Sequence, residues 1–177
     1  MATVDDINDV VAAFLVAAAD ALAFTEGGTP PRVFTSASRP ALDCCNQLTC
    51  WASFFGDADT LSPTGGLGGA DRARKVGAKP VLTVIVQVTR CAPVPKNEAG
   101  KIVLPSPEAL AAVSRLTNQD AWVLWNHMNY ELREGTLAKV CSGAWRDGIA
   151  AVDNQGGCVG WEITFRYPIP GGYPLAT

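Results

Sequence analysis

Three cysteines stand close together at Cys44, Cys45 and Cys50, and they are the residues best suited to chemistry. A cysteine can bind zinc, act as a nucleophile or form a disulfide. A structural zinc site usually draws its ligands from two closely spaced pairs. Here the remaining cysteines stand singly, at positions 91, 141 and 158, and the chain has a single histidine. We therefore expect no metal site and no cofactor.

Cysteine catalysis would require a base beside the thiol, and that base is usually a histidine. The single histidine, His127, lies in an aromatic-rich segment of a predicted helix, where a packed or partly exposed helix residue is the favoured interpretation. A cysteine-dependent hydrolase that uses Cys44, Cys45 or Cys50 with His127 is kept as the alternative from another class. We expect no catalytic residue, and a protein that is not an enzyme.

Other possible motifs are weaker. The glycine-rich segment 65–70 lacks the Gly-Lys-Ser/Thr ending of a phosphate-binding loop. Asp57 and Asp59 beside it, and the basic residues in 70–75, are typical of solvated loop charges. Segment 57–79 as a whole has the composition of a long loop, and loops of such length are usually functional or disordered.

Composition indicates one globular domain. The chain has 177 residues, of which 48% are hydrophobic and 18% are charged, and its net charge is −3. It has no long basic run, so nothing predicts tight binding to DNA. The first residues lack the positive start of a secretory signal, and the apolar run 10–19 is too short for a membrane span of about 20 residues. We expect a protein made in the cytosol, whose cysteines are thiols that pack in the core, with a disulfide between two of them as the alternative.

The first half of the chain predicts one helix followed by strands. Residues 3–24 carry an apolar stripe at helical spacing, and Thr3 with Asp6 forms a capping box. The members of the stripe are Ile7, Val10, Val11, Phe14, Leu15, Ala18 and Leu22. Short strands are expected at 32–36 and 47–55, and the strongest strand pattern runs from Pro80 to position 90.

The second half predicts a loop, a helical region and two strands. Residues 92–105 form a Pro-rich loop. Ser106 caps a helical region that extends to about Glu134, with a possible break near Thr117. Segments 139–145 and 158–167 are expected as strands, of which the second shows clear alternation, and a turn is expected at 154–157.

This order predicts a single α+β domain over residues 1–177. Its sheet is expected to be mostly antiparallel, with the N-terminal helix and the second helical region packed on one face. Cys44 and Cys45 are expected to pack near Cys91 or Cys158 on a neighbouring strand.

Four short segments together resemble the neck proteins of long-tailed phages that infect actinobacteria, known as head-to-tail connector proteins or tail terminators. The matching segments are Leu42 to Cys45 with Gln47-Leu48, Val88 to Pro93, Asp120, and Gly156 to Trp161. They are spread over about residues 40–167, and the informative feature is their order.

The resemblance implies a tail-terminator-like fold and a structural role without catalysis or cofactor. Six copies would form a ring at the head-proximal end of the tail tube, in contact with the major tail protein and with the connector or stopper of the head. DNA would pass through the lumen without sequence-specific binding. The protein would be assembled in the host cytoplasm and reside in the neck of the virion, without a membrane partner.

The chain departs from the family pattern in the glycine-rich segment 57–79 and in the tryptophan-rich second helical region. The exact neck component therefore stays open between terminator, stopper and adaptor.

Overall fold

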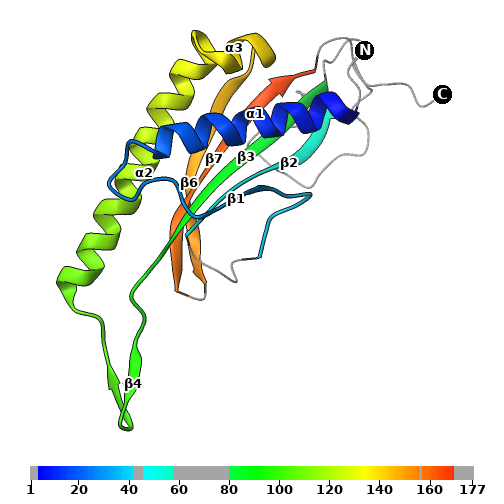
Figure 1. The fold of residues 1–177 in the computed structure, drawn as a ribbon. Coiled ribbons are helices and arrows are strands. Elements are labelled where there is room, and N and C mark those ends of the chain that lie inside the picture. The colour runs from blue at the N-terminus through cyan, green and yellow to red at the C-terminus, as the bar shows by residue number, and fades with distance from the viewer. Residues whose placement is uncertain (1–3, 42–45, 58–79, 156, 170–177) are drawn as a thin grey trace.

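A computed structural model of the chain describes residues 4–41, 46–57, 80–155 and 157–169 (Figure 1). Its elements in chain order are α1 (Val4–Leu22), β1 (Arg32–Thr35), β2 (Gln47–Asp57), β3 (Pro80–Cys91), β4 (Lys96–Glu98), β5 (Lys101–Val103), α2 (Pro107–Arg133), α3 (Thr136–Val140), β6 (Trp145–Gln155) and β7 (Cys158–Pro168).

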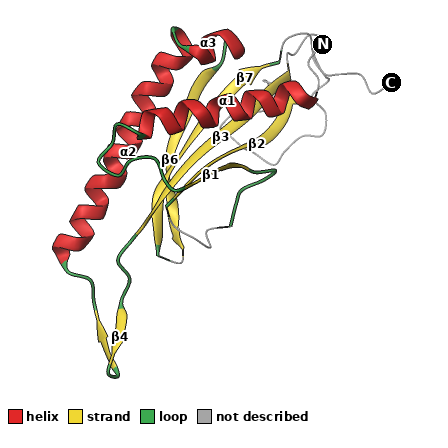
Figure 2. Ribbon diagram, in the orientation of Figure 1, coloured by secondary structure: helices red, strands yellow, loops and turns green. Residues whose placement is uncertain are grey.

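Five strands form one sheet in the order β1-β2-β3-β7-β6 (Figure 2). The β1–β2 pair is parallel and the other three pairs are antiparallel. The predicted α+β class with a mostly antiparallel sheet is therefore confirmed. Strand β3 lies at the centre, which agrees with its strong alternation and its high content of β-branched residues.

The helices cover one face of this sheet. Leu82, Val84, Val86 and Val88 of β3 join buried side chains of both long helices in a single core. The alternate positions of β3 point to the other face, which is more polar and includes the buried Gln87. Gln87 donates a 2.7 Å hydrogen bond from Nε2 to a carboxylate oxygen of Glu162 on β7.

Helix α1 buries the stripe that its sequence predicts. Six of the seven predicted residues are buried, and Ile7 packs at the margin of the core. Phe14 is fully buried, and its ring lies 4.9 Å from the ring of Phe165 on β7 at an interplanar angle of 48°. Tilted aromatic pairs of this kind add to the stabilisation from burial alone. The Thr3–Asp6 capping box falls outside the described side chains.

Helix α2 is continuous, so the predicted break near Thr117 is wrong. The Thr117 hydroxyl donates to the carbonyls of Val113 and Ser114 within the helix and caps no new start. The predicted start is confirmed, because the side chain of Ser106 accepts a hydrogen bond from the amide of Ala109.

Two other predictions need correction. The Pro-rich segment 92–105 contains a β-hairpin, β4–β5. Residues 139–145, predicted as a strand, belong mostly to the short helix α3 and the turn after it, and the strand β6 follows at 145–155. In β6 a bulge between Arg146 and Gly148 shifts the register against β7.

Gly160 of β7 is required by a close approach of the chain. A Cβ atom at this position would collide with the carbonyl oxygen of Val88 on β3. Within the described ranges, no helix combines the length and apolar character needed to cross a bilayer.

Candidate functional site

The most prominent surface feature is a projection between β3 and α2, residues 92–106, which we call the arm. It extends beyond the sheet at the end of β3 (Figure 1). Its two strands pair Lys96 with Val103, Asn97 with Ile102 and Glu98 with Lys101. Ala99 and Gly100 connect them, with φ angles of 52° and 80°. Two consecutive positive φ angles are typical of a type I′ turn, which fits the twist of a tight hairpin.

The arm exposes apolar side chains. Ile102 is 74% exposed and Leu104 is 72% exposed, and Val94 and Val103 are also exposed. Leu110, in the first turns of α2, extends this apolar surface. A two-stranded hairpin alone is at best marginally stable in water. An ordered, apolar and exposed hairpin therefore has the character of a surface that binds a partner.

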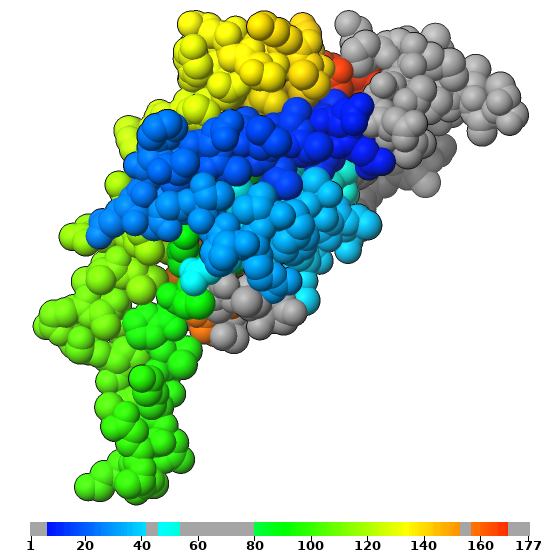
Figure 3. All heavy atoms as spheres, viewed as in Figure 1, coloured from blue at the N-terminus to red at the C-terminus, as the bar shows by residue number. Residues whose placement is uncertain are grey.

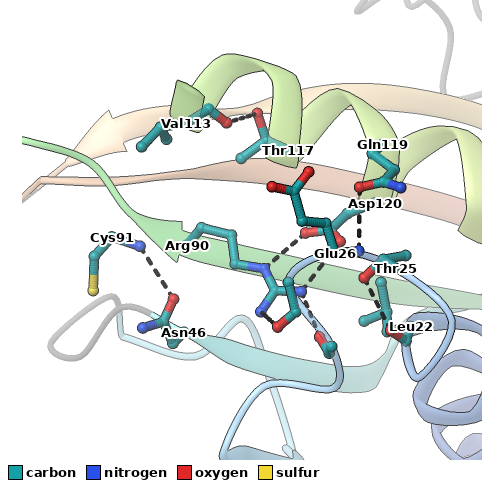
Figure 4. Close-up of polar contacts among 12 residues, drawn as sticks. Leu22, Thr25, Glu26, Asn46, Arg90, Cys91, Val113, Thr117, Gln119 and Asp120 are labelled. Atoms are coloured by element: carbon teal, nitrogen blue, oxygen red, sulfur yellow. Dashed lines mark hydrogen bonds and ion pairs between the residues drawn. The ribbon is translucent and has the colours of Figure 1, made fainter. Parts of the chain in front are cut away.

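A buried ion pair fixes the end of β3 from which the arm leaves. Nε of Arg90 lies 2.7 Å from one carboxylate oxygen of Asp120 on α2, and Nη2 lies 3.1 Å from the other. The same guanidinium donates to the carbonyl oxygens of Gly27 and Gly28, at 3.1 and 2.6 Å (Figure 4). We call these four residues the arm root.

Burial makes the arm root a strong constraint. The side chain of Asp120 is fully buried and that of Arg90 is 5% exposed. A planar guanidinium that grips a carboxylate with two nitrogens admits little change of orientation. The contact joins β3, α2 and the α1–β1 loop, so the arm leaves the body in a fixed direction.

Contacts at the protein surface also hold the α1–β1 loop. The carboxylate of Glu26 pairs with Arg115 at 3.1 Å, and the Glu26 amide donates to the side chain of Gln119. Both side chains of the ion pair are mostly exposed, so the pair contributes little to stability.

Three of the four segments that carry the phage resemblance meet at the arm root. Val88 to Pro93 includes Arg90, and Asp120 is its partner. From the segment Gly156 to Trp161, Cys158 and Gly160 pair with Cys91 and Thr89 across β3 and β7. The fourth segment contributes Gln47 and Leu48 to β2, beside β3, and its residues 42–45 lie outside the described ranges.

The structure assigns different environments to the cysteines. Cys50 is buried in the core, and burial raises the pKa of its thiol far above the usual range. Burial also raises the pKa of Cys141 to about 12. A catalytic thiol needs the opposite shift, so Cys50 is unsuited to be a nucleophile. Cys91 is free and exposed, at the end of β3.

Cys158 takes part in a disulfide bond, so the expectation that the cysteines are thiols fails for this residue and the alternative of a disulfide holds. That expectation rested on the redox state of the cytosol, whereas the bond depends on the positions of two cysteines in the fold. Cys50, Cys91 and Cys141 are free thiols, as expected, but Cys91 is exposed and does not pack in the core. The predicted packing of Cys44 and Cys45 falls outside the described residues.

We expect alkylation to separate the three free cysteines. In the native protein at pH 8, iodoacetamide should modify Cys91 rapidly, and Cys50 and Cys141 only after unfolding, because buried protonated thiols react slowly. Peptide mapping by mass spectrometry would follow each site. Native labelling of Cys50 as fast as that of Cys91 would contradict this prediction and favour the hydrolase alternative.

His127 has the environment of an ordinary helix residue. Its Nε2 lies 3.8 Å from a carboxylate oxygen of Glu131, one turn further along α2, and its side chain is 29% exposed. Among the residues that the structure covers, no group of histidine, cysteine and acidic side chains could hold a metal ion.

Several sequence motifs fall outside the described ranges. These are Asp59, the glycine-rich segment 65–70 and the basic segment 70–75. Asp57 is the last residue of β2, which corrects its assignment to the predicted loop, and the rest of that segment, 58–79, lies outside the described ranges.

Sequence reasoning missed the arm and the ion pair at its root. A signal for the hairpin exists, since Ala99-Gly100 stands between two short polar and apolar runs. No local signal joins Arg90 to Asp120, because thirty positions separate them in the chain.

Comparisons with known proteins add no identification. No protein-family model matches the sequence, and no curated protein matches it.

Proposed function

We propose that this chain is a structural protein of the phage neck, and that it acts as a tail terminator. In this role, copies form a ring, with a hexamer as the expected form, at the head-proximal end of the tail tube. The observation that carries the proposal is the arm, an ordered hairpin with exposed aliphatic side chains that is held in a fixed direction by a buried ion pair.

The arm suits the assembly of identical subunits. A projection that contacts a different surface on the next copy makes a head-to-tail interface, and such interfaces close into a ring when the rotation between copies permits. Binding residues often lie on loops that project from a rigid body of helices and strands. The resemblance of four segments to neck proteins supplies the specific assignment.

The partners follow from this role. The ring would contact the major tail protein on one side and the connector or stopper of the head on the other. DNA would pass through the lumen without sequence-specific binding, and the mildly acidic chain, with a net charge of −3, suits a passage that does not hold phosphates. Catalysis and cofactors have no part in the proposal.

A head–tail stopper or adaptor is the second candidate, because the arm would serve any ring of the neck. The hydrolase alternative has less support. Cys50 is a buried thiol with a raised pKa, while Cys44 and Cys45 lie outside the described residues.

The test is the mass of the purified protein by light scattering, followed by electron microscopy of any large species. We expect a multiple of the 18.6 kDa chain and closed rings with a central hole. Some neck proteins become rings only on the tail. If the purified protein is a monomer, the test is therefore whether the chain is present in intact virions. Absence of the chain from the head–tail junction of intact virions would contradict the proposed function.

A further inference from the structure

Helix α1 has an outer face that no described element covers. The residues of this face recur at helical spacing and are Asp9, Ala12, Val16, Asp20 and, just past the helix end, Phe24. We call them the α1 face. Val16 is 60% exposed and Phe24 is 83% exposed, so both present apolar surface to solvent. Figure 3 shows α1 lying across the front of the molecule as a continuous surface.

The α1 face is acidic as well as apolar. Helix α1 contains no lysine or arginine. Within the described part of the chain, Asp9 and Asp20 have no ion-pair partner, whereas the nearby Glu26 is paired with Arg115. The face therefore combines two uncompensated carboxylates with exposed apolar side chains.

The arm has the complementary character. Because paired residues of a hairpin point to the same side, the lysine side of the arm carries Lys96, Glu98, Lys101 and Val103, and the other side carries Asn97 and Ile102. In the described residues neither lysine has an ion-pair partner. Thus the lysine side of the arm offers Val103 with two ammonium groups against the single carboxylate of Glu98, and the α1 face offers apolar side chains with two free carboxylates.

The two surfaces cannot meet within one subunit in this conformation. The arm projects from one end of the molecule, away from α1, and the body lies between its tip and the α1 face (Figures 1 and 3). The arm root holds that direction through the buried contact of Arg90 with Asp120.

We propose that the arm of one copy docks on the α1 face of the next copy, with its lysines near Asp9 and Asp20 and Val103 against Val16 and Phe24. The contact joins two different surfaces of one chain, so it propagates around a ring. This inference rests on the proposed ring and identifies the surfaces that would close it.

A charge exchange tests the contact. The arm variant carries Lys96→Glu and Lys101→Glu, and the helix variant carries Asp9→Lys and Asp20→Lys. Each variant alone places like charges across the contact, which suppresses association. We therefore expect each to fall to the 18.6 kDa monomer by light scattering, with an unchanged far-UV circular dichroism spectrum.

Mixing the two variants is the decisive step. In an equimolar mixture every arm meets a helix of opposite charge, so assemblies with the wild-type mass should return. Lys139→Glu, at an exposed position on α3, is the matched control and should retain the wild-type mass. Variants that assemble alone, or a mixture that stays monomeric while wild type forms rings, would overturn the arm–α1 contact.

A photo-reactive amino acid at Val103, on the lysine side of the arm, gives a second, independent readout that does not depend on charge. We expect cross-links between copies to map to residues 12–24. Wild-type rings whose cross-links map elsewhere would overturn this contact and leave the ring intact. A wild-type chain that remains monomeric and forms no such cross-links, even at high concentration, would also overturn it, whereas the neck role is decided separately by the presence of the chain at the head–tail junction.

Discussion

Replacing Asp120 by alanine should lower the free energy of unfolding by about 3–5 kcal/mol, because it leaves the buried guanidinium of Arg90 without its counter-charge. Asp120 is fully buried and accepts two hydrogen bonds from Arg90. The two loop carbonyls that also accept from Arg90 cannot neutralise its charge. Urea denaturation of the monomer, analysed with a common slope, would measure the change.

The matched control is Glu26→Ala, which removes the exposed ion pair with Arg115 on the same loop. Exposed pairs are worth about 0–1 kcal/mol, so this variant should unfold almost like the wild type. An Asp120→Ala variant no less stable than Glu26→Ala would show that the arm root is not a structural constraint, and would remove the basis for a fixed arm.

Replacing Phe14 by alanine should cost about 3–5 kcal/mol, since it opens a cavity where α1 packs on the sheet. The ring of Phe14 is fully buried against that of Phe165. Thermal unfolding followed by circular dichroism would show a clearly lower midpoint. Phe14→Leu should give an intermediate loss, because more of the volume is retained.

Asn8→Ala serves as the control for α1, because Asn8 is exposed on the same helix. Surface changes of this kind usually alter stability by no more than about 0.5 kcal/mol. Equal midpoints for the Phe14→Ala and Asn8→Ala variants would contradict the packing of α1 described above.

The elements with regular patterns were predictable from the sequence. The apolar stripe of α1 and the alternation of β3 and β7 follow directly from which side chains one face of each element must bury. The capping serine before α2 was equally clear, since Ser106 is followed at once by proline and an acid.

Where packing between distant parts decides the conformation, local patterns failed. Strand β6 contains a glycine and a bulge, and it is held by its pairing with β7, a tertiary contact. Likewise α3 buries only Leu137 and shows no helical stripe of its own.

The candidate site was the least predictable part. The turn of the arm uses Ala99 where asparagine or aspartate would give the stronger hairpin signal. The cysteines are the residues with obvious chemical reactivity. The arm, in contrast, exposes aliphatic side chains, which indicate a binding surface only once the structure shows that no described element covers them.

The position of β3 at the centre of the sheet has a consequence for the order of folding. Its neighbour β2 precedes it in the chain, but its other neighbour, β7, follows only after the arm, α2, α3 and β6. During synthesis on the ribosome, one edge of β3 therefore has no strand to pair with until β7 emerges. Distant pairing of this kind is slow to form and leaves exposed strand edges prone to aggregation. Productive folding of this chain thus depends on protecting β3 during that interval.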